Sequence, residues 1–209
     1  MNIGIVGAGF VGQTIAKLAK RAGHHVKICN SRDPRTLFTF SLVEKVEVGT
    51  VEEVASFAEV IVLAIPFYAY SSLNKDLFKD KIVIDTTNYY PDRDGHVALL
   101  DQGQTTVSEL IASYLDQVKL VKAFNSIKME DLLQHSFPEN TAQKLALPLS
   151  GDDLNAKAIA HQLYTEFGYD TVDAGALAEG WRFERGMPVY CVLFNQSELY
   201  QNLIQTQRN

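Results

Sequence analysis

A glycine-rich turn joins the first expected strand of this chain to its first expected helix. The apolar run of residues 2–8 has the pattern of a short strand, and residues 10–23 follow it with helical spacing. Gly7, Gly9 and Gly12 form the pattern G-x-G-x-x-G between them. In such a loop the first glycine permits a tight turn, the second lets a pyrophosphate approach the backbone, and the third lets helix and strand pack closely. A lone match is weak evidence, but its placement between a strand and a helix predicts a dinucleotide-binding loop.

The residues that close the second expected strand indicate which dinucleotide is bound. An NAD site often has an acidic residue there, which binds the ribose 2′-hydroxyl, whereas this chain has Asn30, Ser31 and Arg32. A guanidinium offers a planar fork that matches a phosphate, and serine adds a hydroxyl donor. Asp33 follows the arginine, and we expect it to form the turn before Pro34. Arg32 could instead be a solvated loop charge, but we interpret the loop as selective for NADPH.

Expected strands and helices alternate along almost the whole chain. The later strands are expected at 25–30, 45–49, 59–66, 81–88, 119–125, 144–151 and 169–175, and the helices between them at 51–58, 71–78, 107–115, 129–136 and 154–168. This alternation predicts an α/β fold with a doubly wound, mostly parallel sheet, the Rossmann NAD(P)-binding fold. We expect residues 1–209 to form a single domain with a C-terminal helical extension at about 176–209. Pro188 suits the first turn of its last helix.

Composition argues against several other classes of protein. Lysine and arginine number 19 against 25 acidic residues, a net charge of -6, so no overall footprint for nucleic acid or an anionic membrane is expected. Cys29 and Cys191 form no paired motif, and no metal site is expected. The longest apolar stretch, VIVLAIPFYAY, is about half of the roughly 20 residues that a membrane helix needs. We therefore expect a cytoplasmic protein.

Three further strand ends supply candidate site residues, because ligands bind beyond the carboxyl ends of the strands in such sheets. They are Ile65, Pro66 and Phe67; Thr86, Thr87 and Asn88; and Ala123, Phe124, Asn125 and Ser126. These segments contain neither a Ser/Tyr/Lys grouping nor a histidine beside a carboxylate, so no catalytic residue is assigned. Lys122 is titratable, but a structural ion pair or a snorkelling side chain is its simpler role. Hydride exchange with a flavin-like ring therefore fits better than a carbonyl substrate, which needs a positioned proton donor.

The segment after Gly175 is too short to form a separate catalytic domain, because only 34 residues follow and typical domains begin at about 50. It is rich in aromatic residues: Trp181, Phe183, Tyr190 and Phe194. This segment either covers the sheet, forms a homodimer contact, or lets Trp181 or Met187 line a flat-ring acceptor site. The polar stretch 89–106 is expected to be a long loop, which either closes over a ligand or lies on the surface.

Several segments together resemble a known family. They are the glycine turn, Ser31-Arg32, DTTN at 85–88, VKAFNS at 121–126, LPLSGDD at 147–153 with Lys157 after it, and DAGALA at 173–178. This combination resembles the NADPH-dependent reductases of the deazaflavin coenzyme F420. It is also similar to the cytosolic domain of the STEAP metalloreductases, which pass electrons from NADPH through a flavin to ferric or cupric ions.

The resemblance implies roles for individual residues. Those implied to contact the pyrophosphate are Gly7, Gly9, Phe10 and Val11. Ser31 and Arg32 would hold the 2′-phosphate, while Ile65 and Pro66 would pass near the nicotinamide half. Those implied to line the hydride-transfer pocket are Ala123, Phe124 and Asn125.

The implied reaction is hydride transfer between NADPH and a small-molecule acceptor, either F420 or a flavin such as FMN or FAD. The tail EGWRFERGMPVYCVLF departs from the family pattern, which leaves the acceptor open. Three alternatives remain. They are a flavin-mediated ferric reductase, a small-carbonyl dehydrogenase that uses Lys122 or Asn125 to polarise its substrate, and a module that senses NADPH without turnover.

Overall fold

The computed structural model describes residues 1–140 and 144–208, so Asn209, the last residue of the expected extension, lies outside it. Eight strands form one sheet in the order β3-β2-β1-β4-β5-β6-β7-β8. Their bounds are β1 (Asn2–Val6), β2 (His25–Cys29), β3 (Glu47–Val48), β4 (Val60–Leu63), β5 (Ile82–Asp85), β6 (Lys119–Lys122), β7 (Ala146–Gly151) and β8 (Asp170–Asp173). All neighbouring pairs are parallel except β6 and β7. The predicted α/β fold with a mostly parallel sheet is confirmed.

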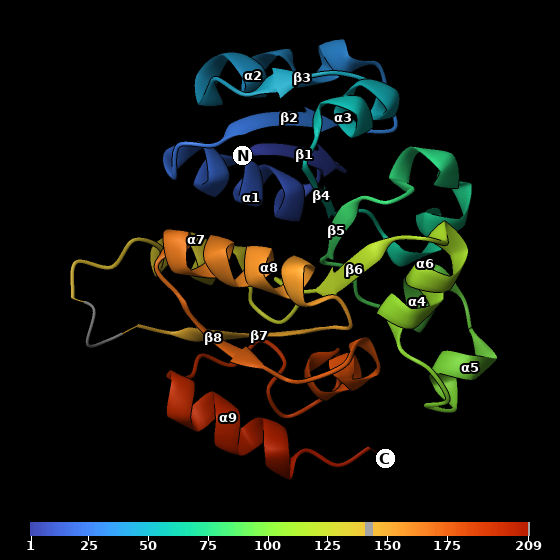
Figure 1. The fold of residues 1–209 in the computed structure, drawn as a ribbon, viewed down its shortest axis with the longest axis vertical. Coiled ribbons are helices and arrows are strands. Elements are labelled where there is room, and N and C mark those ends of the chain that lie inside the picture. Colours follow the sequence, from blue (N-terminus) through green and yellow to red (C-terminus); the bar gives the residue numbers. More distant parts are fainter. Residues whose placement is uncertain (141–143, 209) are drawn as a thin grey trace.

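Helices and short 3₁₀ segments connect the strands. The α-helices are α1 (Phe10–Arg21), α2 (Phe38–Glu44), α3 (Val51–Phe57), α4 (Pro91–Asp94), α5 (Ala98–Asp101), α6 (Val107–Leu115), α7 (Met129–Gln134), α8 (Leu154–Phe167) and α9 (Gln196–Gln205). The 3₁₀ segments are η1 (Pro34–Leu37), η2 (Phe67–Ser72), η3 (Lys75–Phe78) and η5 (Leu177–Phe183). In Figure 1, α2 lies at one end of the molecule and α9 at the other. None of the helices in the described ranges is long and apolar enough to cross a membrane.

The hydrophobic core has a layer on each face of the sheet. α1, α7 and α8 pack against one face, where Ile5, Ile28 and Val62 are fully buried. α3, α6 and η3 cover the opposite face, over Ile61 and Val83. Burial on both faces explains why β4 is apolar at every position.

A third, smaller cluster joins the tail to the end of the sheet. Phe183 of η5 and Leu199 and Leu203 of α9 pack with Val172 of β8. The aromatic tail therefore covers part of the sheet, as one of the expected alternatives stated.

Two expected helices differ in the structure. The helix expected at 71–78 is replaced by η2 and η3, because Leu73 is extended and Asn74 caps η3 by accepting a hydrogen bond from Asp76 N. The prediction that Pro188 begins the last helix is wrong. Gly186 and Cys191 have φ angles of 92° and 57°, which interrupt a helix, and α9 begins only after the Asn195 capping box.

A buried ion pair joins the carboxyl ends of β5 and β6. The Lys122 ammonium lies 3.3 Å from Asp85 Oδ2 and donates to Thr87 O at 2.5 Å. Both side chains of the pair are fully buried. Ser108 at the start of α6 also donates to Asp85, at 2.5 Å. The structural role expected for Lys122 is confirmed.

Replacing Lys122 by alanine would leave the Asp85 carboxylate buried without its cation. We expect Lys122→Ala to lower the free energy of unfolding by about 3 to 5 kcal/mol, measured by urea denaturation. Lys17→Ala is the matched control, because the Lys17–Glu44 pair is largely solvated, with side chains 40% and 25% exposed. It should cost no more than about 1 kcal/mol. Equal losses for the two variants would contradict a stabilising role for the buried pair.

Candidate functional site

The three glycines of the N-terminal turn are needed for different reasons. Gly7 has a φ of 110°, and a Cβ there would lie 2.2 Å from Ala64 O. A Cβ on Gly12 would lie 1.9 Å from Gly7 O. The fold itself therefore requires both glycines. A Cβ on Gly9 would meet no described atom within 4 Å, so this glycine leaves open space at the start of α1.

That open space lies at the N-terminus of α1, where no side chain accepts a hydrogen bond from the first N–H groups. Gly9 is the N-cap of α1, no side chain caps the helix, and its first turn contains no acidic residue. The first N–H groups of a helix have no partner within the helix, and they attract anions together with the helix dipole. Phe10 and Val11 supply two of these groups at the positions expected from the sequence. The turn therefore fits the pyrophosphate of a dinucleotide.

The loop after β2 separates its two arginines. Arg35 forms a bidentate pair with Asp33, with Nη2 and Nε at 2.6 and 3.0 Å from the carboxylate oxygens. The hydrogen bonds from Arg35 hold the pKa of Asp33 below its usual range. Arg32 is exposed, and across the described ranges no carboxylate pairs with its guanidinium. Arg32 is therefore the arginine free to bind a 2′-phosphate.

Asn30 shapes this loop with its side chain. Its Oδ1 accepts a hydrogen bond from Arg32 N at 2.9 Å, and its Nδ2 donates to Thr36 Oγ1 at 2.9 Å. Ser31, between them, is exposed. Asp33 caps η1 by accepting from Arg35 N, as the expected turn before Pro34 requires.

The glycine turn lies where the strand order reverses. β1 lies between β2 and β4, and the chain leaves β1 and β4 in opposite directions along the sheet. Ligands bind at such a switch point, beyond the carboxyl ends of the strands. Ile65 and Pro66 follow β4 at this edge, with Ile65 half-buried and Pro66 exposed.

The next two strand ends are tied together by amides. Asn88 Nδ2 donates to Asn125 O at 2.9 Å, and Asn125 Nδ2 donates to Asn88 Oδ1 at 3.2 Å. Asn125 Nδ2 also donates to Phe183 O at 3.0 Å, which joins the site to η5. Asn125 Oδ1 and Thr87 Oγ1 are buried and have no hydrogen-bond partner in the described part of the chain. A buried polar atom left this way costs about 1 to 3 kcal/mol, so a bound water or ligand group would stabilise the site.

Ala123 and Phe124 lie at the same strand end, but their side chains face the core. Ala123 is fully buried, and the Phe124 ring packs against Tyr164 with ring centroids 4.4 Å apart. Phe124 has a φ of 61°, and its N–H donates to the Tyr164 hydroxyl at 2.7 Å. Any contribution of these two residues to a pocket would come from their backbone.

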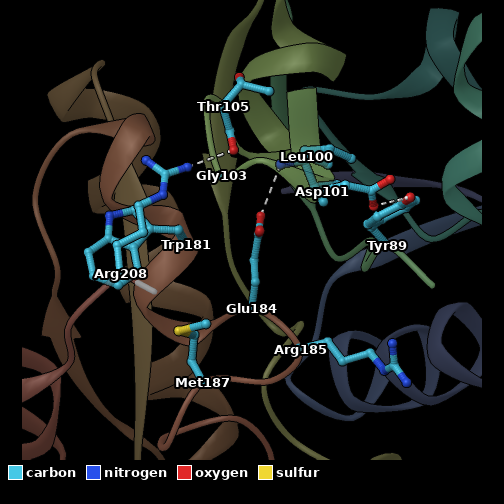
Figure 2. Close-up of a pocket in the computed structure, with 11 residues that line it drawn as sticks. Tyr89, Leu100, Asp101, Gly103, Thr105, Trp181, Glu184, Arg185, Met187 and Arg208 are labelled. Carbon is cyan, nitrogen blue, oxygen red and sulfur yellow. Dashed lines mark hydrogen bonds between the residues drawn. The ribbon is translucent and has the colours of Figure 1, made fainter. Parts of the chain in front are cut away.

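A cavity of about 230 Å³ lies between the segment 89–107 and the tail (Figure 2). The residues that line it are Tyr89, Leu100, Asp101, Gly103, Thr105, Val107, Trp181, Glu184, Arg185, Met187 and Arg208. Trp181 and Met187 both line this cavity, and the hypothesis that one of them contacts an acceptor stays a prediction. The sequence indicated nothing about Glu184, Arg185 or Arg208, because the fold alone brings the tail beside the 100–107 segment.

The stretch 89–106 forms one wall of this cavity and contains α4 and α5, where the sequence predicted a loop. Tyr89 holds it together, since its hydroxyl accepts from Val97 N at 2.9 Å and donates to Asp101 Oδ1 at 2.8 Å. Asp101 also pairs with His96, with Oδ2 3.0 Å from Nδ1. The stretch is thus a surface segment that two short helices and the hydrogen bonds of Tyr89 hold in place. In the ranges that the structure describes, no group of three or more His, Cys, Asp or Glu side chains could hold a metal ion.

Known proteins share this architecture. A hypothetical protein SMa0349 from Sinorhizobium meliloti is similar with a TM-score of 0.80 and 24% identity, over 94% of this chain and 95% of that one. A protein described as a "putative F420 dependent NADP-reductase" from Arthrobacter sp. FB24 is similar with a TM-score of 0.70 and 24% identity, over 84% and 85% of the two chains. At these identities the likeness establishes the fold.

Sequence comparison is informative about the nucleotide-binding half. "Putative protein YjhV" of Escherichia coli K12 is 34% identical over 61 residues, which span 29% of this chain and 44% of that protein. Residues 2–89 match the family described as "NADP oxidoreductase coenzyme F420-dependent", and this range includes the glycine turn and the Arg32 loop. The motifs after residue 89 lie outside the match. This first part of the chain is therefore similar to the coenzyme F420-dependent NADP oxidoreductases.

Proposed function

We propose that the protein transfers hydride between NADPH and the deazaflavin ring of coenzyme F420. The observation that carries the nucleotide part of the proposal is twofold: Arg32 pairs with no carboxylate in the described residues, and the N-terminus of α1 has no side-chain cap. These two features fit a 2′-phosphate and a pyrophosphate. The family match supports both the nucleotide and the deazaflavin. NADPH, when bound, supplies the hydride, and the chain holds the two rings in position.

The remaining parts of the chain have positioning roles. The start of α1 would bind the pyrophosphate through Phe10 and Val11 N–H groups, and Ser31 and Arg32 would hold the 2′-phosphate. Ile65 and Pro66 lie where the nicotinamide half would pass. The Asn88–Asn125 amide pair would orient the carboxamide or a polar ring edge.

A flavin, FMN or FAD, is the second candidate acceptor. The cavity between the segment 89–107 and the tail is lined by Trp181 and Met187, which suit the face of any flat ring. A small-carbonyl substrate is less favoured, because Lys122 is fully buried and its ammonium already contacts Asp85 and Thr87 O. A homodimer, which the aromatic tail suggested, stays a prediction.

Arg32→Ala should weaken NADPH binding while leaving NADH binding nearly unchanged. A hydrogen bond to a charged group contributes about 1.5 to 3 kcal/mol, which corresponds to a roughly 10- to 100-fold higher Kd for NADPH. Isothermal titration calorimetry with both nucleotides measures the difference. Arg35→Ala is the matched control, because the Arg35 guanidinium is paired with Asp33. This variant should bind NADPH almost as tightly as the wild type does. Equal losses for NADPH and NADH in the Arg32 variant would contradict the phosphate assignment.

Gly9→Ala and Gly12→Ala should separate binding from folding. The new Cβ at position 9 points into open space, so the free energy of unfolding should change by less than about 1 kcal/mol. NADPH binding should nevertheless weaken at least about tenfold, because the pyrophosphate would meet the methyl group. The Gly12 variant should lose about 2 kcal/mol or more of stability, because its Cβ meets the Gly7 carbonyl. Normal NADPH affinity in a folded Gly9 variant would place the nucleotide elsewhere.

The acceptor is tested by following NADPH oxidation with coenzyme F420, FMN, FAD and a ferric chelate offered separately. We expect turnover with F420, and faster turnover with NADPH than with NADH. Turnover with FMN or FAD alone would move the assignment to a flavin reductase. Saturable NADPH binding without turnover of any acceptor would instead favour a sensing module.

A further inference from the structure

Glu184 lies between the cavity and the buried Lys122–Asp85 pair. Its Oε1 accepts a hydrogen bond from Val107 N at 3.1 Å and lies 3.7 Å from Lys122 Nζ. Oε2 forms no hydrogen bond with any residue that the structure describes, and the side chain is 17% exposed. Figure 2 shows the carboxylate extending from the tail towards the segment that carries Gly103 and Thr105. Glu184 thus presents a nearly buried carboxyl group to the cavity.

The two carboxylates around Lys122 are not equivalent. Asp85 accepts hydrogen bonds from Ser108 Oγ at 2.5 Å and Thr87 N at 2.9 Å, besides its contact with the ammonium. Glu184 has one backbone donor and a longer contact with the same ammonium. A single buried cation offsets one carboxylate well, so the second is the one that favours its protonated form.

The other charged groups around the cavity modify this preference without removing it. Burial raises the pKa of Glu184, and Asp85 raises it further, whereas Lys122 and Arg208 lower it. The remaining titratable groups that line the cavity are Tyr89, Asp101 and Arg185. Arg208 donates to Thr105 O at 2.8 Å, and Tyr89 is occupied by Asp101. Glu184 is therefore the lining acid with the strongest tendency to hold a proton.

Two contacts connect Glu184 with the strand end at which the hydride-transfer pocket is expected. The preceding residue, Phe183, accepts a hydrogen bond from Asn125 through its carbonyl oxygen. Lys122, which contacts Glu184, ends the strand from which Ala123 and Asn125 continue. The Glu184 carboxyl group is thus connected to the end of β6 through Phe183, its neighbour in the chain, and through its contact with Lys122. At about 230 Å³ the cavity is smaller than a typical ligand pocket of about 300 to 1,000 Å³, so it suits the ring end of an acceptor.

We propose that this cavity receives the acceptor ring and that Glu184 donates the proton which completes its reduction; this inference rests on the proposed function. Hydride from NADPH adds two electrons and one hydrogen to a ring carbon or nitrogen, which leaves a ring heteroatom with the negative charge. Glu184 breaks its O–H bond, and the proton forms the new N–H or O–H bond on the acceptor. The resulting Glu184 carboxylate stays beside Lys122 and regains a proton from water. NADP⁺ and the two-electron-reduced acceptor are the products.

Glu184→Gln tests the role, because the amide oxygen can still accept from Val107 N but the side chain has no transferable acid proton. We expect single-turnover reduction of coenzyme F420, or of FMN if F420 is inactive, to slow about 100-fold with NADPH affinity unchanged. In the wild type the rate should fall as the pH rises through a pKa above the ordinary 4.5, because the acid must be protonated. This fall of the rate with rising pH, the pH limb of the profile, should be absent in the Glu184→Gln variant.

Glu179→Gln is the matched control. Glu179 lies in η5, which Glu184 directly follows, but it pairs with Arg182 at 2.7 Å and does not line the cavity. It should keep both the rate and the pH profile. A Glu184 variant with the wild-type rate and pH limb would overturn the inference and leave the proposed function intact. Absence of turnover with every acceptor in the wild-type protein would overturn both.

A measurement on the unmodified protein keeps the inference testable if the variant does not fold. Carbon-13 carboxyl NMR of the wild type, labelled at glutamate, should show one side chain titrating above the ordinary range. Filling the cavity with oxidised FMN or F420, without NADPH, should shift that resonance selectively. A spectrum in which every glutamate titrates at or below the ordinary value would overturn the inference.

Discussion

The Lys122–Asp85 ion pair holds together the part of the molecule on which the candidate site is built. It joins β5 to β6, and Asp85 recruits Ser108 at the start of α6. The same ammonium reaches Glu184 of the tail. Two charges removed from water are costly unless every group around them is satisfied, so the pair constrains where all these segments lie. The tail held in this way includes Phe183, whose carbonyl oxygen accepts from Asn125, and Glu184, which lines the cavity.

In the proposed site, binding and chemistry would be divided between backbone and side chains. The nucleotide would be held by the N-terminus of α1, which has no side-chain cap, by the space at Gly9, and by Arg32, whose guanidinium pairs with no carboxylate in the described residues. The acceptor would be held by side chains that come from distant segments, among them Trp181 and Glu184. A backbone site depends on a short local motif, whereas a side-chain site depends on long-range packing. The family match, over residues 2–89, includes the local glycine turn and ends before the tail.

Local sequence patterns predicted much of the fold. The apolar runs became buried strands, because a parallel sheet covered on both faces admits few polar residues. Asp33 formed the expected turn, and Lys122 the expected ion pair. The helices predicted at 71–78 and from Pro188 were wrong, because helical spacing alone does not reveal a competing cap, as at Asn74, or a positive φ, as at Gly186.

The sequence by itself determined the strand and helix alternation, the glycine turn and the loop that places Arg32, because each depends on residues close together in the chain. Tertiary structure alone decided that the Asn125 amide reaches the Phe183 carbonyl oxygen. It also turned the Phe124 side chain into the core and brought Glu184 beside Lys122. Residues 122 and 184 are brought together by burial and charge pairing across the sheet, and no local pattern contains that information.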